Sequence, residues 1–250
     1  MEISQARYFH LLQKAKQRYP GRLKRIFQVG GVAAMAEIEA HESKIYSEFA
    51  PLYDKIFGKI FYSRLEHVIE DLEIPPGATV LEVGAGTGTS FPAYPSHCEV
   101  TGIDLAPDML ARAQRKIEEN GWSHLRVLEM NALDLEFPDN TFDYVMAFHV
   151  VTVVPDPIRM IAEAQRVCKP GGNIVIVNHF TSDFPLLGCL TEALDPITRW
   201  LGWRTDLRLK PFIETTSLTV EKVYKLSKAS LYTVVVGRKD HNGFHSAREL

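Results

Sequence analysis

A short apolar run followed by alternating glycines constrains the fold of this chain more than any other feature. Residues 80–83 are mostly apolar and β-branched, which predicts a buried strand. The next five residues, 84–88, read Gly-Ala-Gly-Thr-Gly, and such a loop lets the backbone approach a ligand and offer it unpaired N–H groups. Asp104 follows Gly84 by 20 residues and ends a second expected strand, where a carboxylate can bind ribose hydroxyls. Together these features predict a nucleoside site at the edge of an α/β sheet.

Strand and helix patterns alternate along the chain beyond this loop. Helices are expected at 107–120 and 157–168, and strands at 100–104, 126–129, 143–147 and 173–177. Because strands that alternate with helices usually pair in parallel, this order predicts a sheet with helices on both faces. Two β-rich runs, 219–226 and 231–237, predict a closing hairpin whose last strand enters the sheet antiparallel.

Helical patterns also precede the sheet. Apolar residues recur at helical spacing over residues 2–19, 22–40 and 44–58. Ser63 and Glu66 form the S-x-x-E pattern of a capping box, which predicts that another helix begins there and ends before Pro75.

The composition fits one soluble α/β domain with a short appendage. The chain has 250 residues, of which 46% are hydrophobic and 24% charged. We expect an N-terminal helical arm over 1–43, a main domain over 44–240 and a tail over 241–250. No run reaches the ~18 apolar residues of a membrane span, and the N-terminus lacks an apolar signal core. The three cysteines share no disulfide or metal-ligand spacing, which favours a reducing, cytosolic compartment and no metal site.

Charge is spread unevenly along the chain. Residues 1–36 hold seven basic residues and one acidic residue, a net charge of +6, whereas the remaining 21 basic and 30 acidic residues give −9. A basic arm with an apolar stripe predicts contact with an anionic surface, either a membrane or a nucleic acid. The arm lacks the interleaved aromatic residues that hold single-stranded nucleic acid, so the pattern favours a membrane. The alternative is a solvated arm that packs on its own domain.

The glycine spacing resembles a known family. G-x-G-x-G preceded by Glu82 resembles motif I of the class I S-adenosylmethionine-dependent methyltransferases, rather than the G-x-G-x-x-G of dinucleotide-binding proteins. Other segments that match this superfamily's motifs follow in its usual order, at residues 102–110, 131–132, 137–139, 142–143 and 169–172. The resemblance implies a Rossmann-like seven-stranded sheet with an antiparallel last strand, and N-terminal helices beside it. Two further segments, Val-Val-Pro-Asp-Pro at 153–157 and Val-Asn-His-Phe at 177–180, resemble the Rhodobacter-type bacterial phosphatidylethanolamine N-methyltransferases.

By this resemblance the chain binds S-adenosylmethionine and releases S-adenosylhomocysteine. The implied cofactor residues are Glu82, Gly84, Gly86, Gly88, Asp104, Leu105, Met109, Asn131, Ala132 and Phe148. Among them, Glu82 would help to hold the methionine ammonium, Asp104 would bind the ribose hydroxyls, and Leu105 and Met109 would flank the adenine. Many relatives carry an acid where Asn131 stands, but its amide oxygen can still accept a hydrogen bond from the adenine amine.

The acceptor site is expected to combine aromatic and basic side chains. The candidates are the catalytic residues Tyr46, Tyr53, His149 and His179 and the substrate-binding residues Phe180 and Arg204. Aromatic faces hold methylated ammonium groups, and His, Tyr and Arg side chains can donate hydrogen bonds to a phosphate. Each candidate has a structural alternative, because tyrosines on a helix can be core residues and a histidine at a strand end can bond only local backbone.

Three functions remain open on sequence grounds. The first is a phospholipid N-methyltransferase that methylates phosphatidylethanolamine at the cytosolic membrane face. The second is a soluble small-molecule methyltransferase such as a quinone C-methylase, which would not need the basic arm. The third is a non-catalytic cofactor-binding domain or an RNA-binding module, although the intact cofactor motifs argue against it. The sequence does not predict an oligomeric state.

Overall fold

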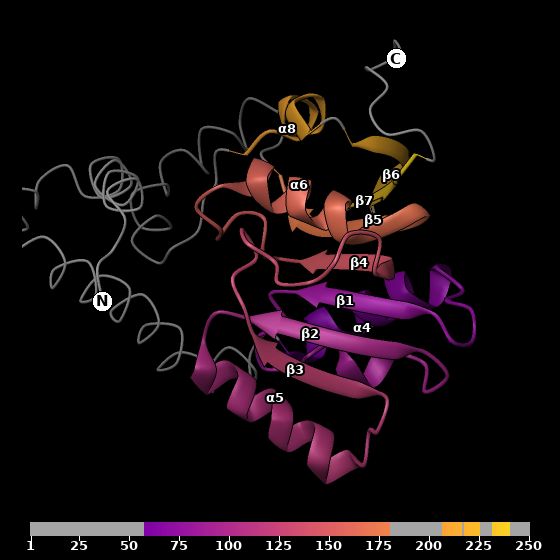
Figure 1. Cartoon of the computed structure of the whole chain (residues 1–250), viewed down its shortest axis with the longest axis vertical. Helices are drawn as coiled ribbons and strands as arrows, with labels where there is room; N and C mark the ends of the chain where they lie inside the picture. Colours follow the sequence, from indigo (N-terminus) through magenta and orange to yellow (C-terminus); the bar gives the residue numbers. More distant parts are fainter. Residues whose placement is uncertain (1–57, 181–206, 217, 226–231, 241–250) are drawn as a thin grey trace, which may run out of the picture.

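The computed structural model describes residues 58–180, 207–216, 218–225 and 232–240 (Figure 1). The expected N-terminal arm, most of the expected helix at 44–58 and the expected tail therefore lie outside the described residues, as do Tyr46, Tyr53 and Arg204. No helix in the described part is long and apolar enough to span a bilayer.

The described strands form one mixed sheet. In chain order they are β1 (Thr79–Val83), β2 (Glu99–Asp104), β3 (Leu125–Glu129), β4 (Phe142–Phe148), β5 (Cys168–His179), β6 (Thr219–Lys225) and β7 (Tyr232–Arg238). Their order across the sheet is β3-β2-β1-β4-β5-β7-β6. The first five strands pair in parallel, whereas β7 is antiparallel to both β5 and β6. This arrangement confirms the predicted seven-stranded class I methyltransferase sheet and its closing hairpin.

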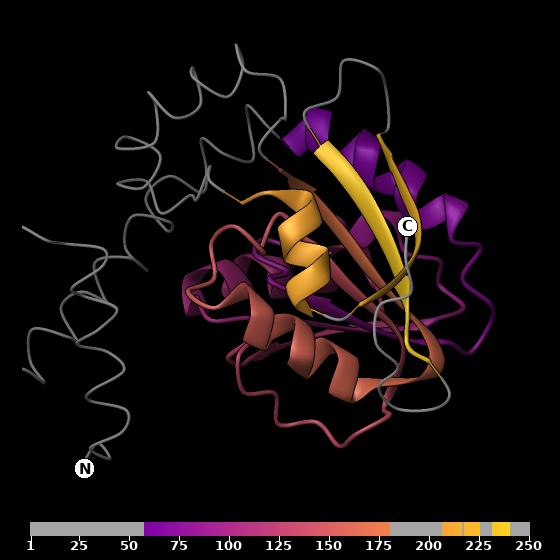
Figure 2. The same ribbon diagram turned by 90° about the horizontal axis from the view of Figure 1, so that it is seen from above.

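Helices cover both faces of this sheet. They are α4 (Gly58–Asp71), α5 (Pro107–Asn120), α6 (Pro157–Val167) and α8 (Leu209–Thr216). Figure 2 shows α4 on one side of the sheet and α6 and α8 on the other. Apolar residues from α4 and α5 share one buried cluster, and those from α6 and α8 share a second. The core is therefore two layers, one on each side of the strands.

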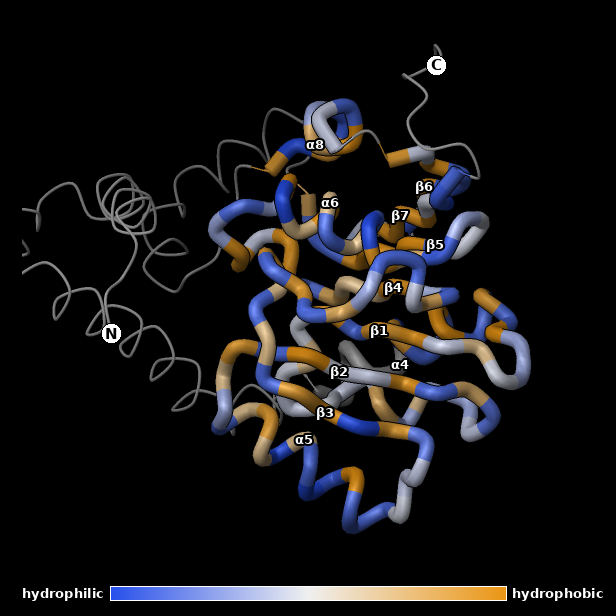
Figure 3. The backbone as a smooth tube through the Cα atoms, viewed as in Figure 1, coloured by the Kyte–Doolittle hydropathy of each residue, from blue (hydrophilic) through white to orange (hydrophobic). Residues whose placement is uncertain are grey.

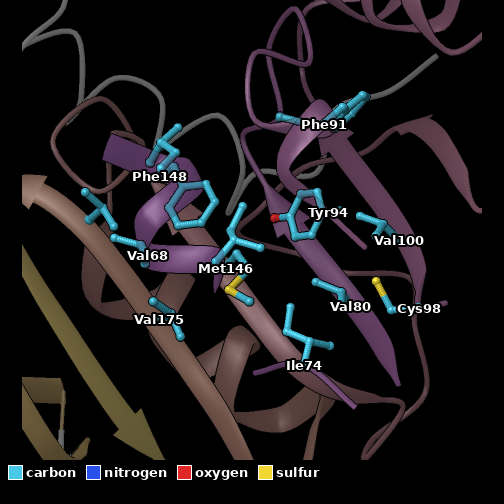
Figure 4. Close-up of a cluster of buried hydrophobic side chains, with 14 of the residues drawn as sticks. Val68, Ile74, Val80, Phe91, Tyr94, Cys98, Val100, Met146, Phe148 and Val175 are labelled. Carbon is cyan, nitrogen blue, oxygen red and sulfur yellow. The ribbon is translucent and has the colours of Figure 1, made fainter. Parts of the chain in front are cut away.

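The central strands are rich in apolar residues. In Figure 3 the orange, hydrophobic positions concentrate along β1, β4 and β5, whereas α5 alternates between polar and apolar positions. This pattern is expected because strands buried on both faces have few polar positions, while a surface helix buries only one side. Figure 4 shows the layer under α4, where Val68 lies among Met146, Phe148 and Val175.

One sequence prediction about helices is wrong, and one helix was missed. Helix α4 spans Gly58–Asp71, so Ser63 and Glu66 lie inside it and do not form its N-terminal cap. The capping pattern is only local, and residues 59–62 contain no glycine or proline that would stop the helix from extending further back. Helix α8 was not predicted at all.

The strict alternation of strands and helices also fails at the first crossover. Between β1 and β2 the chain forms only a short 3₁₀ turn, η1 (Phe91–Ala93). Pro92 and Pro95 disfavour a longer helix here, because proline lacks an N–H donor and restricts the residue before it. The buried Phe91 ring takes the place of a packed helix, since it fills the space beside Gly88 and Gly102.

Candidate active site

The glycine loop crosses the C-terminal ends of β1 and β2. Gly84, Gly86 and Gly88 have φ of 74°, 55° and 70°, a backbone region that residues other than glycine rarely adopt. The N–H groups of Gly84 and Ala85 both donate to the carbonyl of Ile103, at 2.8 and 2.9 Å. The loop is therefore tied directly to β2.

The three glycines meet different surroundings. A Cβ built on Gly84 would lie 2.6 Å from Val150, and one built on Gly88 would lie 2.6 Å from the Phe91 ring. A Cβ on Gly86 would meet nothing within 4 Å. Packing therefore requires the outer two glycines, while the middle one borders open space that a ligand can enter.

Asp104 connects the glycine loop to the start of α5. Its carboxylate accepts the N–H of Gly86 at 2.9 Å and the N–H of Ala106 at 2.9 Å. Burial raises the pKa of this carboxyl, and these backbone hydrogen bonds oppose the rise. A carboxylate has about four lone-pair directions, so acceptor capacity remains for a ribose hydroxyl. Asp104 can thus shape the loop and bind the ribose at the same time.

Glu82 lies beneath the loop and is only 2% exposed. The Ser90 hydroxyl and the Tyr94 hydroxyl each donate to its carboxylate at 2.7 Å. Burial raises the pKa of Glu82 to about 7, and the charge of Asp104 contributes a smaller part of the rise. Tyr94 comes from the short crossover and packs in the cluster of Figure 4. A buried carboxyl of this kind gains from a nearby cation.

The other predicted cofactor residues lie around this loop in different settings. Leu105, next to Asp104, is 61% exposed, which leaves an apolar side chain available beside the ribose site. Met109 lies in the first turn of α5. The Asn131 side-chain oxygen accepts the N–H of Leu133 at 2.9 Å, so a bond from the adenine amine would share that oxygen. Ala132 packs against the buried cluster beside α6, and Phe148 is buried at the end of β4. These positions fit a nucleoside with a cationic methionine chain.

A second group of side chains gathers beside the cofactor loop. The His149 ring meets the Tyr232 ring edge-on at a centroid distance of 4.6 Å, and His179 lies 6.4 Å from the same ring. The Arg64 guanidinium lies over the Tyr232 ring, with Cζ 5.6 Å from its centroid. His179 and Tyr232 are paired residues of β5 and β7. We call these four residues the His-Tyr-Arg cluster.

Backbone geometry places His149 in this cluster. Its φ is 59°, and its N–H donates to the carbonyl of Val177 at 2.7 Å. Backbone of this kind in a residue other than glycine is uncommon and is found at functional sites more often than elsewhere. The next residue, Val150, is the one that a Cβ on Gly84 would strike, so the cluster adjoins the cofactor loop.

The cluster holds its imidazoles in the neutral form. Burial, with smaller contributions from His179 and Arg64, lowers the pKa of His149 to about 3. Burial also lowers the pKa of His179. A neutral imidazole can both donate and accept a hydrogen bond, but one with so low a pKa is a weak proton acceptor. The geometry therefore favours a positioning role for His149.

The structure brings two of the predicted acceptor residues together and adds two neighbours that the sequence did not suggest. His149 and His179 come together as neighbours of one tyrosine, whereas the Phe180 ring packs on Phe212 of α8, at 5.9 Å, in the other core layer. Arg64 and Tyr232 were not predicted as site residues. Tyr232 could have been found only from the register of the hairpin, because that register alone sets it opposite His179.

No group of three or more His, Cys, Asp or Glu side chains within the described ranges could hold a metal ion. The nucleoside loop and the neutral cluster beside it are thus the two features of this sheet edge to which a function can be assigned.

Comparison with known proteins agrees with this geometry. Residues 81–176 match the family model described as a methyltransferase domain. A Cereibacter sphaeroides phosphatidylethanolamine N-methyltransferase is 41% identical over 192 residues, which cover 76% of this chain and 94% of the relative. A Bacillus licheniformis demethylmenaquinone methyltransferase is 35% identical over 136 residues, which cover 53% of this chain and 58% of that relative.

A solved structure of similar fold supports the architecture. The S-adenosylmethionine-dependent methyltransferase of Aquifex aeolicus superposes with a TM-score of 0.56 at 21% identity, covering 79% of this chain and 98% of that protein. At this identity the likeness concerns the fold, while the longer and closer match to the Cereibacter enzyme concerns the family. The chain therefore belongs to the class I S-adenosylmethionine-dependent methyltransferases, in the family of the bacterial phosphatidylethanolamine N-methyltransferases.

Proposed function

We propose that this enzyme transfers methyl groups from S-adenosylmethionine to the amine of phosphatidylethanolamine and of its mono- and dimethyl forms. The single observation that carries the proposal is the extent of the match, because 94% of the Cereibacter phosphatidylethanolamine N-methyltransferase aligns at 41% identity. The aligned length of 192 residues exceeds the 81–176 segment that the methyltransferase family model matches, so the similarity is not confined to that segment.

The main task of the chain in this reaction is to position the two reactants. When bound, S-adenosylmethionine supplies a methyl group already activated by its positive sulfur. The acceptor nitrogen forms the new N–C bond as the C–S bond breaks, and that electron pair stays on sulfur. The nitrogen then loses a proton to water, or to a basic group, before the next transfer. In-line alignment and exclusion of water account for most of the expected rate increase.

Each part of the proposed site has a separate task. The glycine loop, Asp104 and the buried carboxylate of Glu82 would hold the nucleoside and the methionine chain. His149 follows β4 and adjoins that loop through Val150, and would help to orient the acceptor amine. His179 ends β5 opposite Tyr232 and would contact another part of the acceptor headgroup. The roles assigned to Tyr46, Tyr53 and Arg204 remain predictions from the sequence.

We also propose a peripheral membrane location at the cytosolic face. The support is the charge of the arm, since residues 1–36 carry +6 and the rest of the chain −9. Each basic residue near an anionic lipid surface contributes about 1 kcal/mol. Deleting residues 2–36 should abolish sedimentation with anionic liposomes and leave cofactor affinity unchanged. Undiminished liposome binding would place the lipid contact on the main domain 44–240.

The test of the main proposal is lipid analysis of a phosphatidylcholine-free bacterium that expresses this chain. We expect methylated phosphatidylethanolamines to appear, and purified enzyme to label phosphatidylethanolamine with methyl groups from S-adenosylmethionine. The second candidate is a quinone C-methylase. It is supported by the 35% identity to the demethylmenaquinone enzyme, although this match covers a shorter region of the chain. Methylation of demethylmenaquinone with no change in phosphatidylethanolamine would reject the first function and support the second.

A further inference from the structure

We propose that Arg64, His179 and Tyr232 form the subsite that binds the phosphodiester of the acceptor. This inference rests on the proposed function and names the subsite that would select its headgroup. The three residues come from α4, β5 and β7, and they meet beside the cofactor loop.

The electrostatics of the cluster favour an anion. Arg64 carries a permanent positive charge, and no carboxylate within the described ranges forms an ion pair with it. The groups beside it are the imidazoles of His149 and His179 and the phenol ring of Tyr232. Arg64 is half-buried, so its guanidinium is stabilised more by an arriving anion than a fully solvated guanidinium would be. A phosphodiester supplies one negative charge and several acceptor oxygens.

Tyr232 acts as a platform for the guanidinium. Arg64 lies over its ring with Cζ 5.6 Å from the centroid, and a guanidinium held by a cation–π contact can keep its edge of N–H donors available. That edge matches two oxygens of a phosphate, which is why arginine binds phosphate in a bidentate manner. His179 faces Tyr232 across the β5–β7 pair and can donate a third hydrogen bond. Tyr232 is therefore a positioning residue, while Arg64 and His179 contact the ligand.

The location suits a headgroup with its amine and phosphate close together. His149 joins the cluster to Val150, and Val150 contacts the cofactor loop at Gly84. The methionine end of a nucleoside on that loop would thus lie near the cluster. In an ethanolamine phosphodiester, a short two-carbon chain separates the nitrogen from the phosphate. One end can therefore reach the methyl group while the other reaches Arg64.

The test measures KM and kcat with a short-chain phosphatidylethanolamine that dissolves as monomers. Arg64→Gln should raise its KM at least tenfold and change kcat less than threefold, with cofactor Kd within twofold. Arg64→Lys should recover part of the affinity, because it restores the charge but not the fork of donors. The matched control is Arg115→Gln, since Arg115 is exposed on α5 and bonds only its own helix at the Ala111 carbonyl. The control should leave both constants unchanged.

Two tyrosine variants test the platform. Tyr232→Phe keeps the ring and should keep KM within threefold, whereas Tyr232→Leu should raise KM about as much as Arg64→Gln. Competition separates the possible sources of the anion. If glycerophosphoethanolamine competes and inorganic phosphate does not, the subsite recognises the headgroup. If both compete, the subsite recognises phosphate in general.

The outcomes distinguish this inference from the proposed function. Wild-type enzyme that fails to methylate phosphatidylethanolamine would reject the proposed function and the inference together. Active wild-type enzyme with an unchanged KM in Arg64→Gln would reject only the inference, as would competition that persists in that variant. A long-chain primary amine without phosphate provides a further check. Arg64→Gln should leave its KM unchanged, and an equal tenfold rise would show a general defect instead of a lost phosphate contact.

Discussion

The cofactor loop and the His-Tyr-Arg cluster adjoin each other, yet they bury charge of opposite kinds. Beneath the loop, burial raises the pKa of Glu82 to about 7, while in the cluster burial lowers the pKa of His149 to about 3. Both groups are thus driven toward their neutral forms. Glu82 would regain its negative charge when a cation binds beside it. Arg64, in the His-Tyr-Arg cluster, is stabilised when an anion binds. The two regions are therefore suited to the two charged ends of one reaction complex.

The two regions also differ in how the chain builds them. The loop and its carboxylates come from residues 82–104, which are the end of β1, the crossover and β2. The cluster comes from residues 64, 179 and 232 on α4, β5 and β7, and from residue 149 just after β4. The loop should therefore respond to single substitutions by losing structure and cofactor affinity together. The cluster should respond by losing acceptor selectivity while the fold persists.

The largest effect is expected for Gly84→Ala. The new Cβ would lie 2.6 Å from Val150 on a backbone with φ of 74°, so steric clash and backbone strain should together cost about 2–5 kcal/mol of unfolding free energy. Gly86→Ala is the matched control, since its Cβ meets nothing within 4 Å and only the strain remains. Denaturant unfolding measures both costs.

A double variant sharpens this prediction. In Gly84→Ala with Val150→Ala, the clash should be relieved, so the pair should be less destabilised than the sum of the single variants by about 1–3 kcal/mol. Strict additivity would mean that Val150 does not set the position of the loop. Gly86→Ala should fold but bind S-adenosylmethionine weakly, because its methyl group enters the open side of the loop.

Asp104→Ala should weaken cofactor binding at least tenfold, or about 1.5–3 kcal/mol. The ribose hydroxyls would lose a charged acceptor, and the N–H groups of Gly86 and Ala106 would lose theirs. Asp104→Asn keeps an oxygen acceptor, so its affinity for the cofactor should lie between that of the wild-type enzyme and that of Asp104→Ala. Calorimetric titration checks the order, and unchanged affinity in a folded Asp104→Ala variant would contradict the proposed ribose site.

The contrast between the regions explains what could be predicted from the sequence. The α/β sheet and its closing antiparallel hairpin were predictable because strand periodicity and motif spacing are properties of neighbouring residues. The roles of Asp104 and the glycines stay predictions. Arg64 and Tyr232 escaped prediction because only the packing of α4 and the register of β7 bring them together. The crossover through η1 was not predicted either, because it depends on how the Phe91 ring packs beside Gly88 and Gly102. Tertiary contacts of this kind leave no signal in the local sequence pattern.

An acid-dependent loss of stability should come from the cluster. Because the pKa of His149 is lowered from 6.5 to about 3, its contribution to the free energy of unfolding is fully present above pH 6.5 and is lost as pH falls toward 3. The loss should reach at most about 2 kcal/mol at pH 5. His149→Asn removes the titrating ring, and asparagine tolerates the positive φ of 59°. Thermal unfolding between pH 7 and 5 should be flatter in this variant, and equal slopes would assign the acid sensitivity to other groups.

The smallest effect is expected where Tyr94 supports Glu82, and its sign is opposite to that of His149. Because the pKa of Glu82 is raised from 4.5 to about 7, its contribution to stability is present below pH 4.5 and is lost as pH rises through 7. A bound methionine ammonium would favour the carboxylate, so cofactor binding at pH 6 should release up to one proton. Titration calorimetry in buffers of different ionisation enthalpy measures this release.

Tyr94→Phe removes one of the hydroxyls that donate to the Glu82 carboxylate, at a cost of about 1 kcal/mol. The pKa of Glu82 should therefore rise further, and the pH at which cofactor affinity levels off should rise with it. Glu82→Gln should bind the cofactor weakly and release no proton, which makes it the control for ionisation of the ligand itself. Proton release that persists in Glu82→Gln would mean that the buried carboxyl does not face the cation. The neutral forms of Glu82 and His149 would then have no link to the charges of the bound reactants.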